Sequence, residues 1–266
     1  MLLKQLNKLD ERDFAVLRGP LESGRQSPKS IAGTLVMSTF SLALFVYLMY
    51  LMTTSNTNFP YKDLVFYIYS VVTILLIIGA LFYSIPAIYK RGQKMQYFMM
   101  VLVSQFIFGL FFFLTTLLLL GMNRYFLFDE SSLIMIAIML LAGGFILFVF
   151  TWIRFIILLR RGEYRTGSKK GRLRNKFEGK TIVPTAIIVG TSLSLLVQSV
   201  FNNMFIFEGN VIMVVIGSPL LFFTMLFILP EQLVILYCKY RFESFNFDKD
   251  GQLIPMINEV DEVNEI

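Results

Sequence analysis

The chain has 266 residues, of which 56% are hydrophobic and only 16% are charged. Soluble domains carry charges on roughly a quarter of their residues, so this composition excludes an ordinary soluble globular protein and predicts an integral membrane protein. The net charge of +6 would suit nucleic-acid binding, but the basic residues gather at the ends of apolar runs, where they act as orientation signals, so we expect no nucleic-acid partner.

The residue inventory leaves few catalytic options. The sequence has no histidine and a single cysteine, Cys238. Histidine is the commonest general base and metal ligand, and one cysteine cannot form an intramolecular disulfide or a CxxC site. The stretch from Asp248 to Glu259 has the length of a calcium loop, but Leu253 stands where that loop needs glycine. We therefore expect no enzyme activity, no metal site and no cofactor.

Residues 1–30 precede the first apolar run. Leu6, Leu9, Phe14 and Leu17 loosely follow the spacing of one helix face, and basic residues recur every four positions. This pattern favours an amphipathic helix on the inner membrane surface, with a solvated tail as the alternative. We expect this segment to be cytoplasmic.

Six apolar runs follow, each with roughly 20 residues or more, the length that crosses about 30 Å of hydrocarbon. The runs lack the period-two alternation of barrel strands, so the sequence predicts an all-α polytopic membrane protein with one six-helix transmembrane domain. The predicted spans are residues 31–53, 64–89, 97–120, 132–159, 181–201 and 211–238.

The distribution of positive charge predicts the orientation of these spans. Segments 1–30, 90–96, 160–180 and 239–266 contain all but three of the 24 basic residues. Because basic segments stay on the cytoplasmic side, both termini are predicted to be cytoplasmic and the helices to form three successive hairpins. The absence of a cleavable signal and of glycosylation sequons suits a bacterial cytoplasmic membrane.

The most basic of these segments, residues 160–180, is predicted to be a cytoplasmic loop. It is expected to contact anionic inner-leaflet lipids or to dock a cytoplasmic or membrane protein partner. The residues assigned to this role are Arg160, Arg161, Arg165, Lys169, Lys170, Arg172 and Arg174.

The tail, residues 239–266, is predicted to be cytoplasmic and turns acidic near its end. Between Phe245 and Ile257, apolar residues lie on both sides of an Asp-Gly pair, which predicts a small hairpin.

Four polar residues fall inside the apolar runs at similar depth: Arg154, Glu231, Gln105 and Gln232. Charges at such depth are costly, so they call for a partner or a use. One interpretation is structural, with Arg154 and Glu231 forming an ion pair between helices and the glutamines bridging helices. The alternative is an inward-facing cavity for an ion or solute in which Glu231 titrates. In a third interpretation, the two charged side chains extend along their helices to the lipid headgroups.

Two prolines, Pro219 and Pro230, lie within the last run, where each frees a backbone carbonyl one turn earlier. Kinks at both points are predicted to break this helix into segments, a feature that lines sites in transporters. Gly143 and Gly144 are predicted to let helices approach closely.

Two functions follow as hypotheses. The first is a membrane protein without catalytic activity, of a regulatory, assembly or immunity type, that acts through partners at its cytoplasmic segments. The second is a transporter or the permease subunit of an ATP-driven exporter with an inner-leaflet cavity around Glu231. In length and topology alone, the predicted plan is similar to such permeases.

Overall fold

The computed structural model describes residues 6–54, 57–122, 126–168 and 208–256, with side chains placed in the last range from Val214 onward. Within these residues the regular elements are helices, accompanied by two isolated β-bridges. Five of the described helices are long and apolar enough to cross a membrane. The predicted span at 181–201 and Lys169, Lys170, Arg172 and Arg174 lie outside the described residues.

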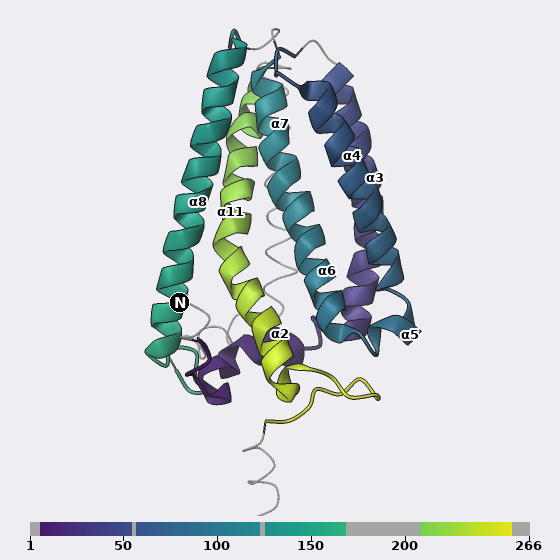
Figure 1. The fold of residues 1–266 in the computed structure, drawn as a ribbon, viewed down its shortest axis with the longest axis vertical. Coiled ribbons are helices and arrows are strands. Elements are labelled where there is room, and N and C mark those ends of the chain that lie inside the picture. The colour runs from purple at the N-terminus through teal and green to yellow at the C-terminus, as the bar shows by residue number, and fades with distance from the viewer. Residues whose placement is uncertain (1–5, 55–56, 123–125, 169–207, 257–266) are drawn as a thin grey trace, which may run out of the picture.

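The five long helices agree with five of the predicted apolar runs (Figure 1). They are α3 (Pro28–Thr54), α4 (Lys62–Phe82), the continuous helix α6–η2–α7 (Gln93–Gln105, Phe106–Leu110 and Phe111–Leu120), α8 (Glu130–Arg160) and α11 (Glu208–Arg241).

The helix α6–η2–α7 forms the centre of this bundle. In its most apolar stretch 67% of the residues are buried, against 11–22% in the other four helices. It packs against α3 and α4 on one side and against α11 on the other, and α11 in turn packs against α8 (Figure 1). The outer helices instead expose large apolar side chains such as Phe40, Phe145 and Leu220. Continuous apolar surface of this kind suits contact with lipid chains.

The helix ends follow local chemistry. Ser27 accepts a hydrogen bond from the backbone N–H of Ser30, and Pro28 occupies the first position of α3, where its missing N–H costs nothing. At the start of α8, the Ser132 hydroxyl donates to the Asp129 carboxylate, and this hydrogen bond lowers the pKa of the Asp129 carboxyl.

The predicted span at 64–89 is wrong at its C-terminal end. The helix α4 stops at Phe82, and a reversal follows that contains only the short helix α5 (Pro86–Tyr89). The cause is Pro86, because a proline disfavours helical backbone in the preceding residue, and Ile85 is extended (φ −72°, ψ 126°). As a result α4, with 21 residues, is shorter than α3, with 27.

The prediction that Pro219 and Pro230 break the last helix is also wrong. Both prolines lie inside α11, which runs from Glu208 to Arg241 without interruption. The ribbon bends near its middle instead (Figure 1). A proline removes one backbone hydrogen bond, and bending with partners from neighbouring helices accommodates that loss inside a packed bundle.

The close approach of α8 and α11 depends on one glycine of the predicted pair. A Cβ atom at Gly144 would lie 2.6 Å from Leu226 Cδ1 and 3.1 Å from a Phe222 ring carbon. At Gly143 the nearest atom would be 3.7 Å away, an ordinary contact. Gly144 therefore permits the approach of the two helices, whereas Gly143 lies beside it.

One end of the bundle carries a folded layer that we call the base, made of residues 6–27, 83–92, 161–168 and 242–256 (Figure 1). Its N-terminal part contains the 3₁₀ helix η1 (Glu11–Arg18) and the short helix α2 (Gly19–Glu22). The apolar residues Leu6, Phe14, Leu17 and Leu21 are each at most 1% exposed. The N-terminal segment is therefore packed against protein, and its apolar side is not available for a membrane surface.

Candidate functional site

The structure brings the two predicted glutamines together between α6 and α11. Gln105 Nε2 donates to Gln232 Oε1 at 2.9 Å and to the backbone carbonyl of Met225 at 3.2 Å. Met225 precedes by one residue the carbonyl that Pro230 leaves without its helical donor. The glutamines thus supply polar partners at the level where α11 carries its proline.

This contact coincides with a change in the central helix. Residues Phe106–Leu110, directly after Gln105, form a π-helical turn. Such turns insert one residue into a helix, occur frequently at functional sites and loosen the regular hydrogen-bond pattern. Gln105 therefore lies where the backbone of the central helix is least regular.

Arg154 and Glu231 line one small cavity of about 90 Å³ between α8 and α11. Arg154 is exposed and Glu231 is half-buried. Pro230 also lines this cavity, whereas Pro219 lies nearer the start of α11 and does not line it. The two charged residues thus share a cavity, and a direct ion pair between them stays a prediction.

Tyr164 closes the same cavity from the base. The chain turns sharply after α8 at Gly162, whose φ of 70° favours glycine, and Tyr164 folds back so that its ring lies 5.0 Å from that of Phe155. The Tyr164 carbonyl accepts a hydrogen bond from the backbone N–H of Val16 at 2.9 Å. The N-terminal segment therefore holds the residue that borders the cavity of Arg154 and Glu231.

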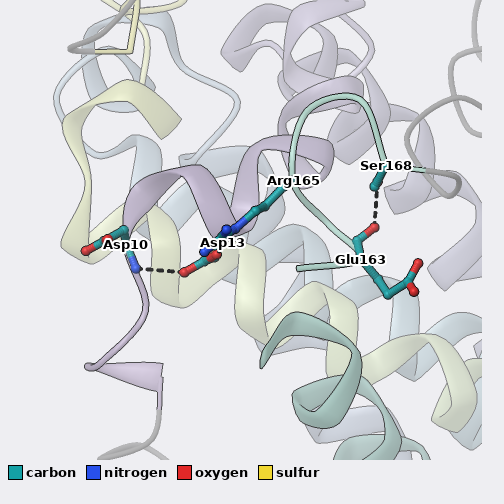
Figure 2. A network of polar contacts seen from close by, with 5 residues as sticks. All are labelled: Asp10, Asp13, Glu163, Arg165 and Ser168. Carbon is teal, nitrogen blue, oxygen red and sulfur yellow. Dashed lines mark hydrogen bonds and ion pairs between the residues drawn. The ribbon is translucent and has the colours of Figure 1, made fainter. Parts of the chain in front are cut away.

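A polar network fastens the same loop to η1 (Figure 2). Arg165 Nε donates to Asp13 Oδ1 at 2.6 Å, and the other oxygen of Asp13 accepts from the backbone N–H of Asp10. Ser168 donates to the Glu163 carbonyl within the loop. Asp13 is 4% exposed, so this ion pair is partly shielded from solvent. Arg165, one of the residues predicted to contact lipid or a partner, thus pairs with Asp13 of the same chain. Arg160 and Arg161, from the same predicted set, are exposed at the end of α8.

The C-terminal end of α11 also binds the N-terminal segment. Arg241 donates to the backbone carbonyls of Leu6 and Asn7 at 2.7 and 3.0 Å, and its guanidinium lies 4.7 Å from the Phe242 ring centre. The ring of Phe14 packs against those of Tyr237 and Phe242. Sequence reasoning missed the contacts of Leu6, Asn7 and Phe14, because their partners lie more than 220 positions away in the chain.

The tail hairpin predicted between Phe245 and Ile257 is confirmed. Phe247 and Leu253 form an antiparallel bridge, and Gly251 in the turn has a φ of 85°. Gln93, at the start of α6, both donates to the Phe247 carbonyl and accepts from the Phe247 N–H. These two hydrogen bonds therefore fix the hairpin to the first residue of α6.

Two buried cations also fix the tail. Lys239 is 2% exposed and donates to the Phe245 carbonyl at 2.8 Å, and Arg18 is 3% exposed and donates to the Ile254 carbonyl at 3.1 Å. Buried charged groups need such partners. For Lys239 the sequence offers only a basic residue at the end of an apolar run, which indicates topology, and for Arg18 it offers no signal of this contact.

Among the described residues, no group of three or more acidic or cysteine side chains is placed to hold a metal ion. Comparisons of the sequence with protein-family models and with curated proteins, and of the structure with solved structures, find no match.

Proposed function

We propose that this chain is a multi-pass membrane protein without catalytic activity of its own, and that it acts through a protein partner bound at the base. The observation that carries this proposal is that the N-terminal segment, the loop after α8 and the tail hairpin interlock into one folded layer. Ordering these three segments costs conformational entropy, which a solvated terminus would not have to lose. Once ordered, they hold their exposed charges in a fixed arrangement that a partner can recognise.

The proposal includes a topology. With a sixth helix in residues 181–201, three hairpins would place both termini and the base on the cytoplasmic side of a bacterial cytoplasmic membrane. The basic residues of the base, together with Arg160 at the end of α8, support this orientation.

Photo-crosslinking in cells tests the partner hypothesis. A photoreactive residue at exposed Arg161 in the base should give one discrete protein adduct, whereas the same residue at Phe145, exposed in the middle of α8, should give none. The purified protein alone, reconstituted in vesicles, should neither transport nor convert a solute. Solute movement by the purified chain would overturn the proposal, and an ATPase as the adduct would favour the permease alternative.

The second candidate function is transport through the cavity that Arg154 and Glu231 line. It is favoured by the position of Pro230 at that cavity and by the π-helical turn beside Gln105. The volume of about 90 Å³ suits a few water molecules or an ion.

A double-mutant cycle separates the structural from the transport interpretation. We expect Arg154→Leu and Glu231→Leu each to lower the free energy of unfolding in detergent, and the double variant to recover about 1 kcal/mol of the loss, because each single change leaves one charge without its neighbour. If Glu231→Leu alone is neutral or stabilising, the carboxylate is kept at a cost for another purpose. Transport would then become the leading function.

A further inference from the structure

A second cavity, of about 480 Å³, opens in the base between the start of α6 and the end of α11. Lys90, Arg91 and Lys94 line it, together with a single carboxylate, Glu243. Within the described part of the chain, none of the three cations forms an ion pair. The cavity therefore presents an excess of positive charge that the described residues leave unneutralised, which attracts an anionic ligand.

The cavity lies at the ends of two apolar helices. Met95 is the third residue of the helix Gln93–Leu120, and Tyr240 is the last residue but one of α11. Both line the cavity, and they are 42% and 54% exposed. Tyr240 donates a hydrogen bond to the sulfur of Met95, and Lys94 Nζ lies 5.3 Å from the centre of the Tyr240 ring. Tyrosine and lysine at the end of an apolar helix are typical of the headgroup level of a bilayer.

The backbone adds to the positive potential of this cavity. The helix α6 begins at Gln93 with Gly92 as its N-cap, and no side chain caps it. The N–H groups of the first helical turn have no acceptor within the helix, so they carry the positive end of the helix dipole. The side chain of Gln93 is held by Phe247 of the tail hairpin, which fixes one wall of the cavity.

A neighbouring cavity of about 500 Å³ provides a contrast. It shares Lys90 and Gln93 with the first cavity, and its three lysines are accompanied by two carboxylates, those of Asp248 and Asp250. A mixed lining of this kind attracts an anion less strongly than a lining with three cations and one carboxylate. The larger excess of positive charge thus belongs to the cavity that also borders the exposed Met95 and Tyr240.

We propose that the cavity lined by Lys90, Arg91 and Lys94 binds the phosphate headgroup of an anionic glycerophospholipid. The lipid's acyl chains would follow the apolar surface that begins at Met95 and Tyr240. The inference rests on the long helices crossing a membrane, and it is independent of whether a protein partner binds the base. Phosphate is the shared chemistry, and it can come from a lipid or from a soluble phosphate ester.

Native mass spectrometry of the purified full chain in neutral detergent tests this site. The probes are phosphatidylglycerol, phosphatidylcholine with the same acyl chains, and soluble glycerol phosphate. We expect phosphatidylglycerol to bind at least about tenfold more tightly than phosphatidylcholine, because three cations face one phosphate. The triple variant Lys90→Gln, Arg91→Gln, Lys94→Gln should lose this preference.

The matched control removes three basic residues that are exposed in the N-terminal part of the base: Lys8→Gln, Arg12→Gln and Arg25→Gln. This control should keep the preference. Equal losses in the two triple variants would overturn the proposal in favour of general charge attraction, and equal binding of the two lipids would overturn it outright. Glycerol phosphate binding as tightly as phosphatidylglycerol would overturn the lipid as the ligand.

Reconstitution of both triple variants in vesicles keeps the result interpretable. If they insert and melt like the wild-type chain, a preference lost only in the first variant reports the three cations of the cavity and not a loss of folding. Failure of the wild-type chain itself to insert would instead contradict the membrane assignment on which the site depends. A loss of lipid preference with an unchanged photo-crosslink at Arg161 would separate this site from the proposed partner site.

Discussion

Replacing Phe14 with alanine will make Cys238 react with a thiol reagent about a hundredfold faster than in the wild-type chain. Phe14 is completely buried, and its ring packs against those of Tyr237 and Phe242. Cys238, the only cysteine of the chain, lies one helical turn before Phe242 on the same face and is also completely buried. Truncation of a buried phenylalanine costs about 3 kcal/mol or more, which favours local opening by about that hundredfold.

The measurement is the rate of maleimide labelling of the purified full chain in detergent, with Phe40→Ala as the matched control. Phe40 is 69% exposed on α3, so its truncation should leave the rate unchanged. Trypsin gives a second readout, since cleavage after Arg18, which is 3% exposed, requires release of the N-terminal segment. An unchanged labelling rate and unchanged cleavage in Phe14→Ala would show that this segment does not depend on the Phe14 contact.

The same release should also affect the cavity of Arg154 and Glu231. Val16 holds the Tyr164 carbonyl, and Tyr164 borders that cavity. A partner that displaces the N-terminal segment would therefore open the base beneath these two charges. Such a coupling would link the two proposed functions through the hydrogen bond between Val16 and Tyr164.

Replacing Gln96 with leucine is expected to lower the free energy of unfolding by roughly 2 kcal/mol. The Gln96 side chain is completely buried and donates from Nε2 to two backbone carbonyls, those of Pro28 at 2.9 Å and Tyr83 at 3.1 Å. It thereby joins the start of α3 and the end of α4 to α6. Leucine has a similar volume but no donor, so both hydrogen bonds are lost at a site that water does not reach.

Chemical unfolding in mixed detergent micelles measures this effect, and Gln252→Leu is the matched control. Gln252 lies in the exposed turn of the tail hairpin, where the same substitution should change stability by less than about 0.5 kcal/mol. If the two substitutions have equal effects, the hydrogen bonds of Gln96 do not contribute to the joining of the three helices.

Features that depend on local properties of the chain were predictable from the sequence. The apolar runs predicted five of the long helices because the length and hydropathy of a run are local properties, and a bilayer satisfies a helix without reference to its neighbours. The tail hairpin was predictable for the same reason, since Asp250 and Gly251 favour a turn wherever they occur between apolar residues. The end of α4 was missed because hydropathy continues through Pro86 while the helical backbone does not.

The arrangement of the candidate site was less predictable from the sequence than the helices were. The sequence placed Gln105 and Gln232 at similar depth, and the structure joins them at 2.9 Å. Equal depth in the membrane does not determine which faces of two helices meet. The sequence therefore predicted that Arg154 and Glu231 lie at similar depth, but not that they line one cavity.

The sequence by itself determined that the chain forms long apolar helices with basic ends, because hydropathy and charge act residue by residue. Only the tertiary structure decided that residues 6–27 form part of a folded base. Their apolar side chains suit a lipid surface and a protein surface equally well, and the choice depends on Arg241, Tyr237 and Phe242 lying at the end of the last described helix to receive them. Contacts between the two ends of a chain arise from the path of the helices between them, which no local pattern encodes.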